Sequence, residues 1–121
     1  MVPWKKVRLE LGPTDDLPTG SVSRAYLLQL PLRENGHIDG VTLGVDPLRA
    51  TARRFWTSEA DQSGYVVQAE QRWRLVQLRA GYTHWEMASF ADCAINPGEV
   101  IEFLEAGQFI LPFVVADMQQ L

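Results

Sequence analysis

The fold class of this chain follows from Val100–Glu105 (VIEFLE), the turn at 106–108 (AGQ) and the run Phe109–Met118 (FILPFVVADM). Two β-favouring runs joined by a short glycine-containing turn predict a β-hairpin. In the first arm, Ile101, Phe103 and Glu105 share one face, opposite to the other three residues. The second arm hardly alternates from 109 to 116, so we expect both of its faces to contact other protein. Such a strand needs the rest of the chain around it.

The remaining chain shows the same strand-and-turn pattern. Apolar and polar residues alternate, or β-favouring residues cluster, in several short segments, which are 6–11, 21–32, 52–57, 65–69, 73–79 and 84–90. Turn signals, among them Ala80-Gly81, recur roughly every 8–12 residues, as in barrels and sandwiches. The sequence therefore predicts one all-β domain over residues 1–121. We expect a compact, mainly antiparallel β-barrel of about seven or eight short strands, with a β-sandwich as the alternative.

The segment between the second and third predicted strands is the least regular part of the sequence. Glycines and aspartates interrupt any period in residues 38–47, so an irregular connection is predicted there. Asp46 and Pro47 suit the cap and first residue of a helix. We therefore expect at most one short helix, near Leu48.

Composition and termini suggest where the protein resides. The chain of 121 residues is 46% apolar and 21% charged, as in a globular domain. Its single cysteine, Cys93, allows no internal disulfide, which favours a reducing compartment. Charged residues occupy the N-terminus where a secretory leader would be apolar. The longest apolar run has eight residues, whereas a membrane helix needs about 20. We expect a cytoplasmic protein with no membrane partner.

Charge is distributed unevenly along the chain. The net charge is −4, which argues against a nucleic-acid partner because phosphate contacts need a basic surface. All 11 Lys and Arg residues precede Ala80, where they meet nine acids, and six further acids follow. We therefore expect a carboxylate of the C-terminal hairpin, from Glu99, Glu102 or Glu105, to pair with Arg53 or Arg54.

The tetrapeptide Arg53-Arg54-Phe55-Trp56 is the most distinctive candidate site. In a strand, one of the two arginines would face a cleft and offer its planar fork to a carboxylate or phosphate. The ligand-binding candidates are thus Arg53, Arg54, Trp56 and Trp73. The alternative, which we favour, is that the arginines form structural ion pairs and the aromatic side chains belong to the core. That core is expected to bury Tyr26, Leu28, Leu30, Trp56, Trp73, Phe103, Phe113 and Val115.

No catalytic, metal or cofactor motif is evident. His37 and His84 have no ligand-like spacing, and a Cys93–His84 nucleophilic pair is disfavoured against a structural cysteine. We assign no catalytic residue, no metal and no cofactor. The sequence favours a non-catalytic module that binds a small anionic ligand or a protein partner. The alternatives are a structural protein that forms a homodimer through its C-terminal hairpin and, less favoured, an enzyme with an unrecognised site.

Short motifs also suggest a family. They are Gly20 to Tyr26, Leu30-Pro31-Leu32, Gly36 to Asp39, Arg53 to Trp56, Pro97 to Ile101 and Pro112 to Val115. Together they resemble small uncharacterised all-β proteins of proteobacteria. The resemblance implies a bacterial cytoplasmic origin and transfers no activity and no functional residue.

Overall fold

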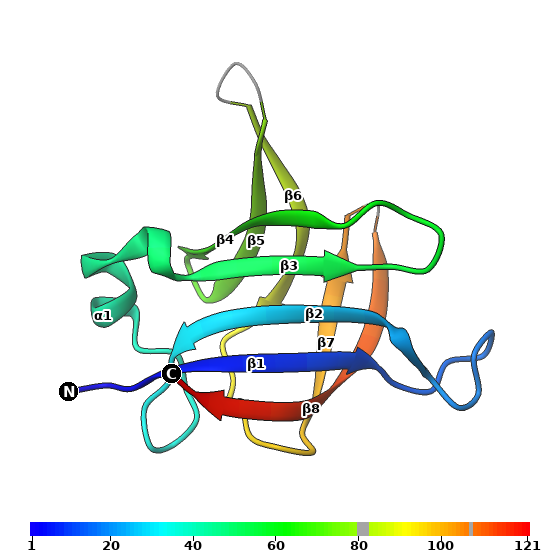
Figure 1. The fold of residues 1–121 in the computed structure, drawn as a ribbon, viewed down its shortest axis with the longest axis horizontal. Helices are drawn as coiled ribbons and strands as arrows, with labels where there is room; N and C mark the ends of the chain where they lie inside the picture. Colours follow the sequence, from blue (N-terminus) through cyan, green and yellow to red (C-terminus); the bar gives the residue numbers. More distant parts are fainter. Residues whose placement is uncertain (80–82, 107) are drawn as a thin grey trace.

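The protein folds as a closed barrel of eight strands (Figure 1). The structure is a computed structural model that describes residues 1–79, 83–106 and 108–121, with only the backbone at 78, 79, 83 and 84. Each strand is antiparallel to the next, and the last pairs with the first. The strands are β1 (Trp4–Leu11), β2 (Ser21–Pro31), β3 (Thr51–Phe55), β4 (Gln62–Ala69), β5 (Arg72–Arg79), β6 (Thr83–Ala91), β7 (Val100–Glu105) and β8 (Phe109–Gln120). The predicted antiparallel barrel is confirmed, and the sandwich alternative is not.

The C-terminal hairpin forms with the predicted arms. β7 and β8 pair from Val100 opposite Val114 to Glu105 opposite Phe109. The expectation that both faces of β8 contact other protein is wrong at the start of the strand, because Ile110 on its outer face is 64% exposed. In a closed barrel only the inner face of a strand meets the core, so Ile110 stays largely in solvent, whereas Pro112 and Val114 on the same face are half-buried. The predicted turns at Ala80-Gly81 and at Gly107 lie outside the described residues.

A short helix replaces the irregular connection that was predicted at 38–47. Helix α1 (Gly40–Val45) begins where the Asp39 side chain accepts hydrogen bonds from the backbone of Val41 and Thr42. This cap offsets the low helix propensity of Gly40 and Gly44. The helix also packs on the barrel, because the Leu43 side chain is buried in the core. The expected helix near Leu48 is present as the 3₁₀ helix η1 (Pro47–Arg49). No helix in the described chain is long and apolar enough to cross a membrane.

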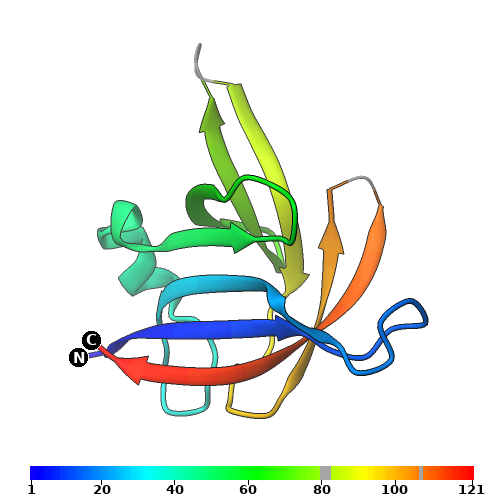
Figure 2. The ribbon, with the colours of Figure 1, turned by 45° about the vertical axis from the view of Figure 1, so that its right-hand side comes forward.

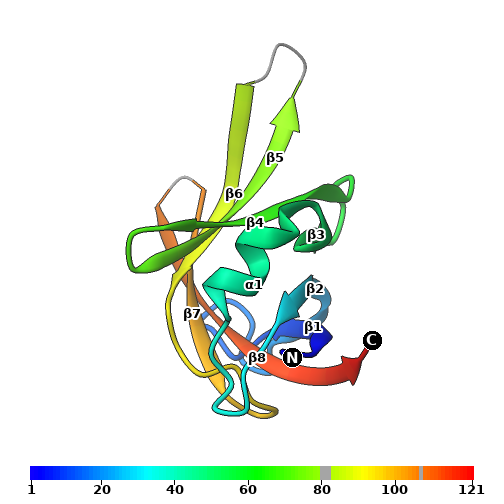
Figure 3. The same ribbon diagram turned by 90° about the vertical axis from the view of Figure 1, so that its left-hand side faces the viewer.

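The two ends of the barrel differ. At one end, the segments before β3 and before β7 bring Ile38, Leu43 and Ile95 into the core. Figure 3 views this closed end, where α1 lies, and Figure 2 shows both termini there. At the other end, β1, β3 and β7 finish and their connections leave the barrel. We call this the open end.

An aromatic cluster fills the barrel interior. Phe103 is its centre, with ring centroids 4.9 Å from Tyr26, 5.0 Å from Phe90 and 4.9 Å from Phe113. Seven of the eight predicted core residues are buried, as expected. Trp56 is the exception, being only half-buried, because it follows the last residue of β3 at the open end. Its ring still reaches Phe113, at 6.4 Å.

The β5–β6 hairpin extends beyond its neighbours (Figures 1 and 2). Strand β4 pairs with β5 as far as Tyr65 opposite Val76, where a bulge interrupts the β5–β6 ladder. Gly64 adjoins this point, and a Cβ atom there would lie 1.9 Å from the Val76 carbonyl oxygen. Only glycine permits this approach of two backbones. The bulge and Gly64 together let the hairpin bend away from the barrel.

Candidate ligand-binding cleft

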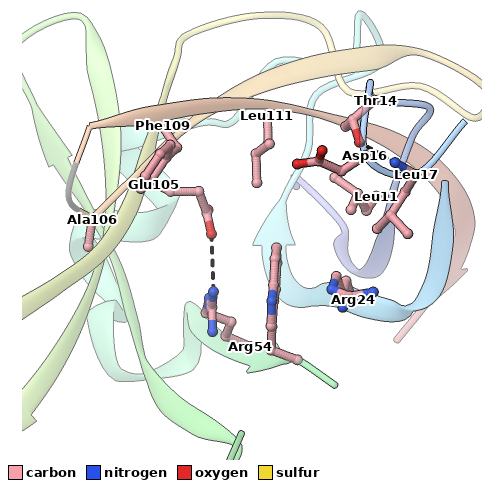
Figure 4. Close-up of a pocket in the computed structure, with 11 residues that line it drawn as sticks. Leu11, Thr14, Asp16, Leu17, Arg24, Arg54, Glu105, Ala106, Phe109 and Leu111 are labelled. Carbon is pink, nitrogen blue, oxygen red and sulfur yellow. Dashed lines mark hydrogen bonds and ion pairs between the residues drawn. The ribbon is translucent and has the colours of Figure 1, made fainter. Parts of the chain in front are cut away.

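A cleft of about 510 Å³ lies at the open end of the barrel (Figure 4). Its walls come from the ends of β1, β3 and β7, from the start of β8, from β2 and from the loop after β1. Most of these side chains are apolar, and four carry charge. The lining residues are Leu11, Thr14, Asp16, Leu17, Arg24, Arg54, Trp56, Glu105, Ala106, Phe109 and Leu111.

Strand alternation explains how the charged side chains reach the cleft. In β3, Ala52 is buried inside the barrel, so Arg54 points inward and Arg53 outward. In β7, Ile101, Phe103 and Glu105 point inward and are buried. Arg54 and Glu105 are at or next to the last residue of their strands. They therefore meet just above the aromatic cluster, with the cleft on their outer side.

Tyr26, Arg54 and Glu105 form a buried polar network. The Tyr26 hydroxyl donates to the Glu105 carboxylate, and Arg54 Nη2 donates to the same carboxylate over 3.3 Å. Arg54 Nε donates to the Tyr26 hydroxyl oxygen over 3.3 Å, and Nη1 lies 3.4 Å from Glu59 Oε1. The predicted pairing of a C-terminal carboxylate with Arg53 or Arg54 is therefore confirmed by Arg54 and Glu105.

Burial raises the pKa of two groups in this network, the Glu105 carboxyl and the Tyr26 hydroxyl. Burial raises the pKa of the Glu105 carboxyl above its ordinary value, and the hydrogen bonds from Tyr26 and Arg54 oppose that rise only in part. Burial also raises the pKa of the Tyr26 hydroxyl, and the adjacent Glu105 charge adds to the effect. Tyr26 therefore stays protonated and acts as a hydrogen-bond donor, which suits a structural role.

The Trp56 indole has two guanidinium groups near its ring. Arg54 lies 4.1 Å from the ring centroid and Arg24 lies 5.7 Å from it. Arg54 forms ion pairs with the carboxylates of Glu59 and Glu105. The hydrogen-bond partner of Arg24 is uncharged, since its Nη1 contacts the Ser21 hydroxyl at 3.4 Å. Among the described residues, no carboxylate lies within 4.0 Å of Arg24. The cleft thus holds one arginine that is neutralised and one that is not.

The structure separates the four predicted binding residues. Arg54 and Trp56 line the cleft. Arg53 lies on the outer face, 3.6 Å from Asp61 and stacked on Phe55. Trp73 is buried at the start of β5, where its indole donates to Asp92 over 3.1 Å. The four residues therefore do not form a single site.

Sequence reasoning missed Arg24 and, apart from Trp56, the apolar residues of the cleft. A signal for Arg24 was present, because it shares a strand face with Tyr26, Leu28 and Leu30 in β2. Continuing that alternation toward the N-terminus places Arg24 on the inner side of the open end. Leu17 carried no such signal, since it lies in a loop whose path depends on tertiary contacts.

A second polar cluster, near the closed end, has a structural role. Asp92 accepts from Trp73 and lies 3.4 Å from His37 Nδ1, which ties the turn after β2 to the segment after β6. Burial raises the pKa of the neighbouring Cys93 thiol, as do the charges of Asp92 and Glu99, so the thiolate is disfavoured. The side chain of His84 lies outside the described part. In that part, no three metal-ligating side chains come together.

The chain matches no protein-family model, no curated protein and no solved structure. The resemblance to small proteobacterial proteins therefore stays a prediction.

Proposed function

We propose that this protein is a non-catalytic binding module that takes a small ligand into the cleft at its open end. The observation that carries the proposal is the cleft's lining, in which apolar side chains surround a few fixed polar groups. Small-molecule sites share this composition and have volumes of roughly 300–1,000 Å³. The cleft, at about 510 Å³, falls within that range.

The filled barrel interior defines how deep such a ligand would enter. An eight-stranded barrel is just wide enough for its own side chains or for one small ligand. Here Tyr26, Phe90, Phe103 and Phe113 occupy the interior. The ligand would therefore rest on the Arg54–Glu105 pair at the mouth, with its apolar surface against Leu111 and Phe109.

Filling the cleft is expected to prevent binding of an uncharged apolar probe. Leu111 lines the cleft, so Leu111→Trp places a bulky ring in the ligand's space. We expect Nile red to bind the unmodified protein with increased fluorescence and the variant at least about tenfold more weakly, a loss of roughly 1.4 kcal/mol. A fluorescence titration measures both dissociation constants.

The matched control is Ile110→Trp, which adds the same ring on the outer face of the same strand. Ile110 is exposed, and its neighbour Leu111 points inward. Nile red binding that survives Leu111→Trp but is lost in Ile110→Trp would place the site outside the barrel. That result would refute the proposal.

A second function, self-association, is favoured by one observation. The outer face of the hairpin exposes the directly paired Leu104 and Ile110 and, beyond Glu102, Val100, and we call these three apolar residues the hairpin patch. Contiguous exposed apolar residues mark interaction sites in soluble proteins. A two-fold axis through the hairpin patch would bring it against its copy, as in most homodimers. This candidate is compatible with ligand binding because the cleft opens on the opposite face of β8.

A charge in the hairpin patch is expected to abolish such a dimer. Sedimentation velocity on the unmodified protein should show a dimer at a protein concentration of about 100 µM, which exceeds the dissociation constant expected for an interface of moderate affinity. Ile110→Lys should convert it to a monomer because the lysine would be desolvated without a partner. Val22→Lys, on an exposed residue of β2, is the control and should leave the dimer intact. A monomeric unmodified protein at that concentration would exclude self-association through this face.

A further inference from the structure

The charges that line the cleft are not all neutralised within the protein. Arg54 and Glu105 are paired with each other, at 3.3 Å. Arg24 and Asp16 also line the cleft, and the described residues offer neither of them an ionic partner within 4.0 Å. Figure 4 shows Arg24 and Asp16 apart from each other, from β2 and from the loop after β1. Arg24 is therefore the cation in the cleft that remains available to an anion.

The position of Arg24 suits recognition of a carboxylate. The guanidinium has two uncharged neighbours, the Ser21 hydroxyl at 3.4 Å and the Trp56 ring at 5.7 Å, which orient it and leave its charge unneutralised. A guanidinium can offer two parallel N–H donors to a carboxylate. Arg54 is less suited, because an anion beside it would also approach Glu59 and Glu105, 3.4 and 3.3 Å from its nitrogens.

The other cleft residues limit what the anion can carry. Asp16 is a carboxylate on the wall without an ionic partner among the described residues, so a second negative charge on the ligand would be repelled. Leu11, Leu17 and Leu111 supply an apolar surface, and Phe109 extends it at the rim. Covering Phe109 would remove from water an aromatic ring that is now 68% exposed.

We infer that the cleft selects an amphipathic monocarboxylate, with its carboxylate on Arg24 and its apolar body against Leu111 and Phe109. This inference rests on the proposed function of the cleft and specifies the class of ligand. A ligand of that class has a single carboxylate head group, one negative charge and an aromatic or branched aliphatic body.

The inference is tested with a pair of ligands that differ only in the head group. Isothermal titration at pH 7 and low salt would compare 3-phenylpropanoate with 3-phenylpropanamide. We expect the carboxylate to bind about tenfold more tightly, as a charge-assisted bidentate contact would produce. Arg24→Gln should remove that advantage and leave the weaker amide binding unchanged. Phenyl phosphate, a dianion, should bind more weakly than the carboxylate.

Arg53→Gln is the matched control, because Arg53 lies one residue from the cleft arginine Arg54 but faces outward. It should retain the tenfold preference, and thermal melts should show that both variants are folded. Equal binding of the two ligands, or an Arg24→Gln variant that keeps the preference, would overturn the inference and leave the proposed function standing. Tighter binding of phenyl phosphate would also overturn it. If neither 3-phenylpropanoate nor 3-phenylpropanamide binds, this ligand class is rejected. The proposed function is tested separately, by the Nile red titration.

Discussion

Replacing Glu105 with alanine is expected to lower the free energy of unfolding by about 3 kcal/mol, the low end of what removal of one partner from a buried ion pair costs. The variant leaves the Tyr26 hydroxyl without its acceptor and leaves Arg54 with Glu59 as its carboxylate partner. Both consequences are unfavourable because Tyr26 is buried and the Arg54 side chain is only 13% exposed. Urea denaturation followed by tryptophan fluorescence measures the change.

Two companion variants separate charge from hydrogen bonding. Tyr26→Phe removes one donor to Glu105 and should cost about 1–3 kcal/mol. Glu105→Gln keeps a side-chain oxygen as acceptor and should cost less than Glu105→Ala. A change below about 0.5 kcal/mol for Glu105→Ala, typical of a surface substitution, would show that the network does not stabilise the fold.

The pH dependence of these variants follows from the direction of the Glu105 shift. The folded carboxyl keeps its proton above the usual pKa near 4.5, so folding takes up a proton in the interval above that value. The free energy of unfolding contributed by Glu105 therefore falls as pH rises through that interval. The stability of the unmodified protein relative to Glu105→Gln should then be lower at pH 7 than at pH 4.5. A relative stability that rises instead would mean that the folded carboxyl has a lowered pKa.

Replacing Phe103 with alanine is the change with the largest expected effect, about 3–5 kcal/mol. Phe103 is fully buried and its ring contacts three others, from Tyr26, Phe90 and Phe113. Its loss opens a cavity at the centre of the barrel, beneath the Arg54–Glu105 pair. Chemical denaturation should show a lower midpoint with a nearly unchanged slope.

Leu104→Ala is the control for this prediction, since it truncates the next residue on the outer face of β7. Leu104 is 38% exposed, so its truncation should cost well below the Phe103 value, about 1 kcal/mol or less. Similar losses at the two positions would contradict the assignment of inner and outer faces in the hairpin.

The sequence alone determined the strands and their order along the chain. Alternation in 6–11 and 21–32 and the turn signals between them predicted strands close to β1 and β2. Alternation also found β7, where Ile101 and Phe103 repeat with period two, and the β-favouring run at 109–118 found β8. The sequence also anticipated an ion pair between a hairpin carboxylate and Arg53 or Arg54, which the structure shows as Arg54–Glu105, since the C-terminal third has acids and no Lys or Arg of its own.

Tertiary structure decided the features that depend on position around the barrel. Helix α1 formed despite two glycines because Asp39 caps it and the core accepts Leu43, which a local pattern does not reveal. Ile110 on the outer face of β8 stayed exposed because the apolar composition of a strand does not specify whether other protein covers it. Trp56 lies at the open end because it follows the last residue of β3, whereas Trp73 lies at the closed end because it is near the start of β5. The cleft itself arises only when the barrel closes, because closure brings Arg24 of β2, Arg54 of β3 and Glu105 of β7 to one rim while the aromatic cluster fills the space beneath them.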